Sequence, residues 1–220
     1  MDTPAISGLT ALPVAFFDRH PAEVAPDLLG AYLVSTAGGA QTGGVIVEAE
    51  AYLGRDDSGS HAATHGITKR NATMYGPPAT AYVYFTYGNH HMLNFVCEPE
   101  GTAGAVLIRA IEPVWGLDEM TARRHGRPLG ELCNGPGKLT AALGLNLSDN
   151  GASLGVGRLT VYHGLRPDAP TIKTSGRVGL SQGHELELRY YLADSSFVSR
   201  GRTGPPPAKR AATEPKGTPR

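Results

Sequence analysis

The chain has 220 residues, 40% of them hydrophobic and 18% charged, which is typical of a globular protein able to bury one sizeable core. Twenty Lys and Arg balance 20 Asp and Glu, so the net charge of zero does not by itself indicate a polyanionic partner. The first residues contain neither the basic segment nor the long apolar run of a signal peptide, so none is expected. No stretch approaches the roughly 20 apolar residues of a membrane span. We therefore expect a soluble cytosolic protein with one domain over residues 11–200.

The cysteines and the C-terminal segment add two expectations. Cys97 and Cys133 have no CxxC spacing, so free thiols in a reducing compartment are expected. From residue 200 to 220, six Lys and Arg accompany a single acid, which leaves 14 basic and 19 acidic residues in the rest of the chain. Residues 201–220 are basic, rich in Pro and Gly and without aromatic side chains, and this composition predicts disorder.

The first elements in chain order are short. Residues 22–34 predict a helix that ends at Gly30 and leads into a strand. The sequence GGVIVEAEAYLG (43–54) predicts a strand. Alternation along it would place Val45, Val47 and Ala49 on one face and Ile46, Glu48 and Glu50 on the other. The polar segment 55–78 that follows is as long as loops become without being functional or disordered.

A hairpin of aromatic residues comes next. In YVYFTYGNHH (82–91), Tyr82 and Tyr84 share one strand face, and Tyr87-Gly88-Asn89 suits the tip of the turn. The return strand is HMLNFVC (91–97), and AGAVLIRAIEP (103–113) predicts a further strand ended by its proline.

The remaining segments predict short helices over 116–126 and 134–145 and late strands around 158–163 and 186–192. Helices and strands are mixed, without an internal repeat or a regular βαβ rhythm. The fold class that this order favours is α+β.

Three familiar patterns lack the context that their ligands require. GASLGVGR (151–158) has glycines but no strand–GxGxxG–helix arrangement, and GPGKL lacks the first glycine and the Ser/Thr of a phosphate-binding loop. His61 and His65 are four residues apart and His90 and His91 are adjacent, but no HExxH motif or Cys/His ladder accompanies them. We expect neither a nucleotide cofactor nor a metal.

Glu48 and Glu50 are the best candidates for chemistry, because a strand end beside a long polar loop can direct a carboxylate into a cleft. The alternative is a solvated outer face. Two nearby carboxylates are also typical of glycosidases, as acid and as base or nucleophile, although the sequence does not give their separation. Tyr52 lies on the face of Glu50, where it could hold a flat ring or simply pack with a bonded hydroxyl.

Several segments, in order, resemble the alkyladenine (3-methyladenine) DNA glycosylase family. They are EAEAYLG (48–54) followed by His61, then TKRN (68–71), YVYFTYGNHHMLN (82–94), LIRAIEP (107–113) and LCNGPGKL (132–139). The similarity extends from residues 16–18 to 177–180, so it covers most of the chain. It implies one α+β domain with a curved antiparallel sheet, short surrounding helices and a protruding β-hairpin, acting without metal or cofactor.

The resemblance also implies a reaction. A damaged purine would be turned out of double-stranded DNA, and Glu50, as general base, would activate the water that hydrolyses its N-glycosidic bond. Tyr87, at the hairpin tip, would fill the vacated space in the duplex. Glu48 matches a family carboxylate without a defined role. The expected lesions are alkylated or deaminated purines such as 3-methyladenine, hypoxanthine and ethenoadenine.

The residues around the flipped base follow from the same resemblance. Asn94 would obstruct the exocyclic amine of a normal base. The aromatic pocket would consist of Tyr52, His61 and Tyr84, whose electron-rich faces should attract cationic purines. The DNA contacts would be made by Thr68, Arg70, Arg109 and Lys138, with Arg109 facing a phosphate near the water. The protein is expected to act as a monomer.

Two further readings stay open. A hydrolase of free nucleosides or sugars would need the carboxylate but not the exposed Tyr87, and a nucleic-acid-binding module on a related fold would not need Glu50. No lysine follows Glu50 on its strand, so no Schiff base and no strand cleavage are expected. The late aromatic run ELRYYL lacks the tryptophan usual in the family, and Trp115 is the sole tryptophan of the chain.

Overall fold

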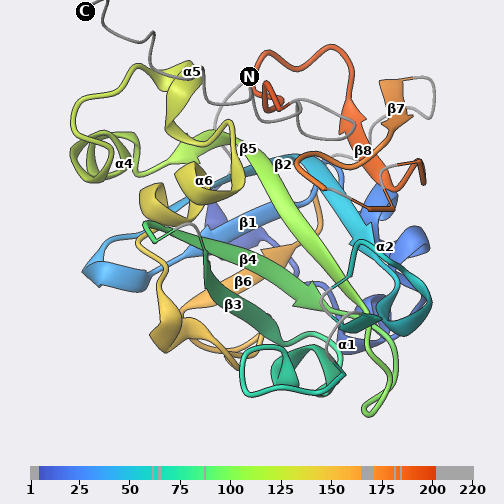
Figure 1. Cartoon of the computed structure of the whole chain (residues 1–220). Helices are drawn as coiled ribbons and strands as arrows, with labels where there is room; N and C mark the ends of the chain where they lie inside the picture. The colour runs from blue at the N-terminus through green and yellow to red at the C-terminus, as the bar shows by residue number, and fades with distance from the viewer. Residues whose placement is uncertain are drawn as a thin grey trace, which may run out of the picture.

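The computed structural model describes residues 5–60, 62–63, 66–86, 88–164, 171–180, 182–183 and 185–201. These residues form one antiparallel sheet of eight strands with short helices around it (Figure 1), which confirms the predicted α+β class. The strands are β1 (Tyr32–Ser35), β2 (Thr42–Tyr52), β3 (Ala81–Thr86), β4 (His90–Val96), β5 (Ala105–Trp115), β6 (Leu159–Tyr162), β7 (Ile172–Ser175) and β8 (Arg189–Leu192). The helices are α1 (Val14–Phe17), α2 (Pro21–Asp27), α4 (Leu117–Arg123), α5 (Leu129–Leu132) and α6 (Pro136–Ala142).

The long strands β2 and β5 form the centre of the sheet. The strand order is β3-β4-β5-β2-β1-β6. On the side of β2 away from β5, β1 pairs with the first half of β2 and β8 pairs with the second half. β7 pairs with β8 and extends the sheet there. β2 therefore has different neighbours along its length on one side. Figure 1 shows α4, α5 and α6 together near one end of β5 and α2 at the opposite side of the molecule.

The predicted strand faces of β2 need one correction. The pairing with β5 shifts register between Ile46 and Glu48, which is the signature of a β-bulge. As a result Ile46 lies in the main core together with Ala49 and Ala51, instead of sharing a face with the glutamates. The bulge thus keeps Glu48 and Glu50 on the side away from the main core.

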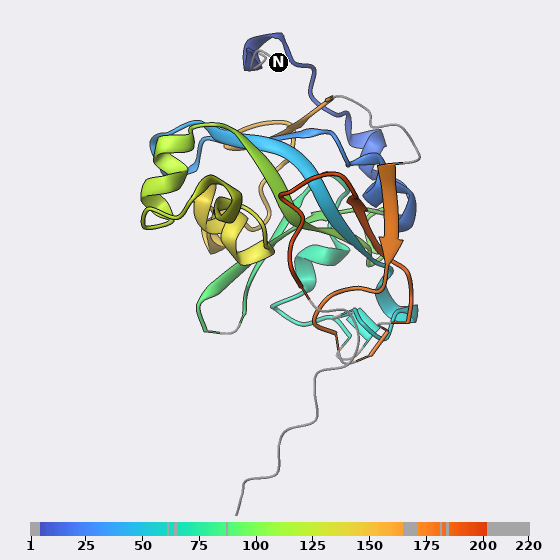
Figure 2. The ribbon, with the colours of Figure 1, turned by 90° about the horizontal axis from the view of Figure 1, so that it is seen from above.

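Two apolar clusters divide the faces of the hairpin. Ala81 and Val83 of β3 belong to the main core, whereas Tyr82 belongs to a smaller cluster against which Tyr84 packs. The predicted alternation along this strand is confirmed. Figure 2 shows the β3–β4 hairpin projecting from the body of the protein.

Other expectations were partly wrong. β5 continues to Trp115 instead of ending at Pro113, because the proline pairs with Gly44 next to another register shift, and proline is tolerated at such bulges. α2 ends at Asp27, earlier than predicted, before the chain turns through Gly30 at φ 87° into β1. The short strand β7 and the single turn α5 were not predicted.

Two further expectations concern the C-terminal segment and membrane-spanning helices. Of the C-terminal segment 201–220, Gly201 alone lies within the described residues, so the predicted disorder falls outside them. Within the described ranges, no helix combines the length and the hydropathy that a bilayer crossing requires.

Candidate active site

One register row across the sheet builds the site. Tyr82 pairs with Asn94, Asn94 with Leu107 and Leu107 with Glu50. Directly paired residues project to the same face of a sheet, so strands β3, β4, β5 and β2 each contribute one side chain. The flanking same-face positions, two residues along each strand, add Tyr84, Met92, Arg109 and Tyr52.

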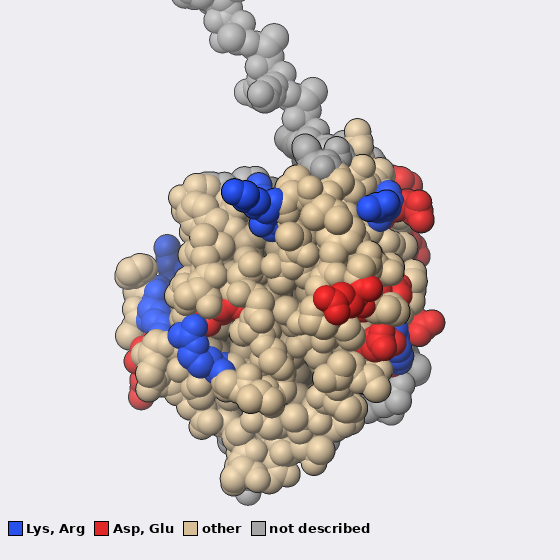
Figure 3. All heavy atoms as spheres, turned by 90° about the horizontal axis from the view of Figure 1, so that it is seen from below, with Lys and Arg blue, Asp and Glu red and all other residues tan. Residues whose placement is uncertain are grey.

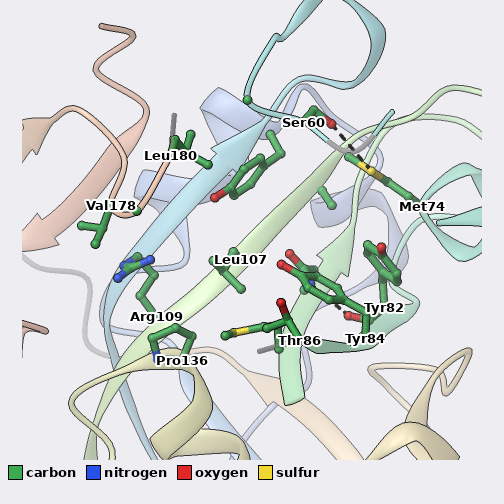
Figure 4. A pocket seen from close by; sticks show the side chains of 16 residues that line it. Ser60, Met74, Tyr82, Tyr84, Thr86, Leu107, Arg109, Pro136, Val178 and Leu180 are labelled. Carbon is green, nitrogen blue, oxygen red and sulfur yellow. Dashed lines mark hydrogen bonds between the residues drawn. The ribbon is translucent and has the colours of Figure 1, made fainter. Parts of the chain in front are cut away.

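A cavity of about 280 Å³ lies over this row. Its volume is near the lower end of small-molecule sites, roughly 300–1,000 Å³, and is suited to one small ligand. Figure 4 shows Tyr82 and Tyr84 on one side of it, Val178 and Leu180 on the other, and Leu107 between them. The start of α6 also reaches the cavity through Pro136.

Glu50 lies directly behind the cavity wall and is fully buried. Its Oε2 accepts hydrogen bonds from the Tyr52 hydroxyl at 3.0 Å and from Arg109 Nη1 at 3.2 Å, and its Oε1 accepts one from the backbone N–H of Val178 at 2.7 Å. All three donors line the cavity. A carboxylate offers about four lone-pair sites, so these three bonds leave room for one more donor.

Glu48 is also buried, so it does not lie on a solvated face. Arg109 and Arg189 donate to its Oε1 at 3.0 and 2.6 Å, and Ser199 donates from its hydroxyl and its backbone N–H. Arg109 thus bridges the two glutamates. Burial lowers the pKa of Arg109, but Glu50 and Glu48 outweigh it and raise the pKa above its ordinary value, so the guanidinium stays charged.

Arg109 therefore has partners that the sequence did not predict. It is 5% exposed and lies in the cavity wall, with its described bonds to Glu48, Glu50 and Ser199. Its phosphate contact stays a prediction. In the structure Arg109 orients the carboxylates and balances their charge.

The ring of Tyr52 is held from behind by a buried ion pair. Arg177 lies over it, with Cζ 4.7 Å from the ring centroid, and its guanidinium binds both oxygens of Asp57 at 2.5 and 2.6 Å. Arg177 and Asp57 are fully buried. Burial raises the pKa of Tyr52 well above its usual value, and the charge of Glu50 raises it further, so the hydroxyl remains a donor toward Glu50.

The opposite wall is formed by Tyr84 and Asn94. Tyr84 packs against Tyr82 with ring centroids 5.2 Å apart, and Arg70 lies over the Tyr84 ring with Cζ at 5.2 Å from its centroid. Asn94 is 4% exposed and lines the cavity, while its Nδ2 donates to the carbonyl of Tyr82 at 3.1 Å. The amide is therefore fixed in orientation at the cavity wall.

The other predicted DNA contacts have local partners in the structure. Thr68 shares hydrogen bonds with Asn71 that close the turn before residues 72–75. Lys138 Nζ donates to Asn134 Oδ1 at 2.7 Å beside the start of α6. Their contacts with DNA stay predictions. His61 and Tyr87, predicted as pocket and intercalating residues, lie outside the described residues.

Several site residues were not predicted. Val178 and Leu180 follow Arg177 in the segment RVGL, which marked the end of the family resemblance but received no role. Tyr82 could have been found, since it alternates with Tyr84 on one strand face. Arg189 and Ser199 had no local signal, because they meet Glu48 only after a separation of 141 and 151 residues.

One face of the molecule carries side chains of both charges. Figure 3 shows Lys and Arg as well as Asp and Glu side chains on this face, separated by uncharged residues. No group of three or more His, Cys, Asp and Glu side chains suited to a metal ion occurs among the residues that the structure describes.

An aromatic-walled cavity over a buried carboxylate–guanidinium pair indicates an enzyme that binds a flat ring and acts beside it. Comparison with known proteins defines that class further. The model of the methylpurine-DNA glycosylase (MPG) family matches residues 15–196, and the chain belongs to this family. It is therefore a DNA N-glycosylase, and DNA is its substrate.

Curated relatives agree in name. A protein of Chlorobium luteolum is 47% identical over 88% of this chain and 99% of its own length. One of Methanoculleus marisnigri is 47% identical over 86% of this chain and 98% of its own, and one of Prosthecochloris aestuarii is 45% identical over 89% and 94%. Each is named "Putative 3-methyladenine DNA glycosylase". These relatives favour an enzyme over the non-catalytic module.

Proposed function

We propose that the protein removes alkylated and deaminated purines from duplex DNA by hydrolysis of the N-glycosidic bond, with Glu50 as the general base. The observation that carries this proposal is the position of the Glu50 carboxylate behind the wall of a cavity with aromatic sides. A purine within the duplex cannot reach such a cavity, so the nucleotide has to be turned out of the stack, at a cost of a few kcal/mol. Tyr87 at the hairpin tip would fill the gap in the duplex.

The contacts of Glu50 support a role as base. Tyr52, Arg109 and Val178 fix both carboxylate oxygens, and a water in the cavity could donate to the remaining lone-pair site. The water would lose its proton to Glu50 as its oxygen attacks C1′ of the sugar, and the bond electrons would leave with the purine. A positioned base typically accelerates such a step by about 10²–10⁴-fold. The fixed negative charge would also stabilise the positive charge that develops on the sugar.

The cavity wall supports the choice of substrate. Tyr52 and Tyr84 can stack on a flat base, which contributes roughly 1–3 kcal/mol per base. The Asn94 amide is held by the Tyr82 carbonyl, so it cannot easily turn away from a base that clashes with it. Guanine, which carries an exocyclic amine at C2, would be excluded by this clash, whereas hypoxanthine, ethenoadenine and 3-methyladenine have no amine at C2.

The test uses duplex oligonucleotides with one hypoxanthine or one ethenoadenine, incubated with wild type and Glu50→Gln, followed by alkaline cleavage at abasic sites. Cleavage by wild type and a loss of at least about 100-fold in Glu50→Gln is expected. Glu112→Gln is the matched control, because Glu112 is an exposed glutamate on the neighbouring strand β5. Equal release of base by wild type and by a correctly folded Glu50→Gln would refute the role of Glu50.

The flipping step has its own test. Tyr87→Ala should reduce excision from duplex DNA much more than hydrolysis of a free damaged nucleoside, since only the duplex needs a side chain in the vacated space. Equal activity of Tyr87→Ala and wild type on duplex DNA would contradict the proposed role. Strand cleavage before alkali treatment would contradict hydrolysis by water alone.

A further inference from the structure

The two aromatic walls of the cavity each have an arginine over the ring. Arg177 lies over Tyr52 and Arg70 lies over Tyr84, at 4.7 and 5.2 Å from the ring centroids. Neither arginine is among the side chains that line the cavity. Each guanidinium thus packs on a ring that lines the cavity without lining the cavity itself.

Most of the described charged groups next to these rings and to Glu50 are paired with an opposite charge. Glu48 and Glu50 are balanced by Arg109 and Arg189, with which they form ion pairs and hydrogen bonds. Asp57 neutralises Arg177 through two hydrogen bonds. Arg70 is different, because no carboxylate within the described part of the chain forms an ion pair with it.

Arg70 is nevertheless held in place. Its Nη2 donates to the backbone carbonyl of Phe85 at 3.1 Å, which keeps the guanidinium over the ring of Tyr84 on the same strand. A fixed cation on one face of a ring opposes a second cation on the other face by direct Coulomb repulsion. A neutral base feels no such repulsion.

We propose that Arg70 is a specificity-determining residue that acts through Tyr84 against purines with a formal positive charge and so shifts the preference of the enzyme toward neutral lesions. This inference rests on the proposed function, in which the damaged base stacks on Tyr84. It limits the expectation that the electron-rich pocket simply favours cationic alkylpurines, because the positive charge behind Tyr84 opposes that attraction.

The size of the effect follows from the geometry. A base stacked at about 3.5 Å from Tyr84 would place its charge roughly 9 Å from the Arg70 guanidinium. Coulomb's law at this separation, with an effective dielectric constant between about 80 and about 20, corresponds to a change of about 2-fold to about 20-fold in relative binding. The effect should weaken as ionic strength rises, because Arg70 is exposed.

The experiment compares single-turnover excision of a neutral and a cationic purine by the same enzyme. The substrates are duplex DNA with hypoxanthine and DNA methylated by dimethyl sulfate, from which the release of the positively charged 3-methyladenine is followed, with spontaneous release subtracted. Arg70→Gln should raise the ratio of the cationic to the neutral rate by about 2-fold to about 20-fold. Arg70→Lys, which keeps the charge, should retain most of the wild-type ratio.

Lys69→Gln is the matched control, because it removes a charge from the neighbouring exposed position and should leave the ratio unchanged. If Arg70→Gln lowers both rates equally, Arg70 contacts only the DNA backbone and the inference is overturned. A wild type that releases neither base from duplex DNA would instead overturn the proposed function, and the inference with it. The two failures are therefore distinguishable.

Discussion

The Asp57–Arg177 pair gives the sharpest prediction about stability. Arg177→Met removes the cation from a fully buried pair and leaves the Asp57 carboxylate without its main partner. Removing one member of a buried ion pair typically costs roughly 3–5 kcal/mol, and Asp57 keeps only its bonds from the backbone N–H groups of Leu53 and Gly59. For a protein of this size, each kcal/mol lost from the free energy of unfolding lowers the melting temperature by about 2–4 °C. The melting temperature of Arg177→Met should therefore fall by roughly 6–20 °C.

The assay is urea and thermal unfolding of a double-mutant cycle. Asp57→Asn retains an oxygen for the backbone donors, so the double variant Asp57→Asn/Arg177→Met contains no unpaired buried charge and should lose less than the sum of the single variants, by about 0.5–3 kcal/mol. Arg127→Met is the control, because the side chains of Arg127 and its partner Glu131 are 61% and 49% exposed and such a surface pair should contribute at most about 1 kcal/mol. Strict additivity in the cycle, or an Arg177→Met variant as stable as the control, would refute the reasoning.

Three more outcomes are expected. Tyr52→Phe removes the hydrogen bond to Glu50 and should lower the single-turnover excision rate by about 10-fold, with melting temperature as the check on folding. Burial raises the pKa of Asp57, but the Arg177 guanidinium and the backbone donors lower it more, so the pKa of the folded protein lies below the ordinary value. The stability that the Asp57 carboxylate contributes is therefore present at neutral pH and is lost as the pH falls below about 4. Acid unfolding should accordingly be steeper for wild type than for the double variant. Burial raises the pKa of the Cys133 thiol to about 12 and that of Cys97 still further, so a disulfide reagent at neutral pH should label both thiols in urea and neither in the native protein; rapid native labelling would contradict their burial.

The sequence predicted the parts of the site that have a local pattern. Alternation along the hairpin located Tyr82 and Tyr84 on one face, and the strand from 43 to 54 placed Tyr52 beside Glu50. The bulge near Glu48 was not predictable, because it arises from the register between β2 and β5 and not from a signal within β2 alone. The same holds for Pro113, which is accommodated by an irregular pairing.

The hydrogen-bond partners of the buried carboxylates could not be predicted from the sequence for another reason. Arg109, Arg189 and Ser199 meet Glu48 across separations of 61 to 151 residues, and a buried ion-pair network follows only from the three-dimensional arrangement. Charged residues in strands are mostly solvated, so the pattern favoured exposure for Glu48. The structure instead buries it among donors that satisfy its oxygens.

The dependence of β2 on residues near the other end of the chain has a consequence for biosynthesis. Glu50 receives a hydrogen bond from Val178, and Glu48 receives two from Ser199. Before the segment that contains Val178 and Ser199 has been synthesised, both carboxylates lack these donors. The cavity also lacks the side that Val178 and Leu180 form. The network around the two carboxylates and this side of the cavity can therefore form only after residues 178–199 have been synthesised.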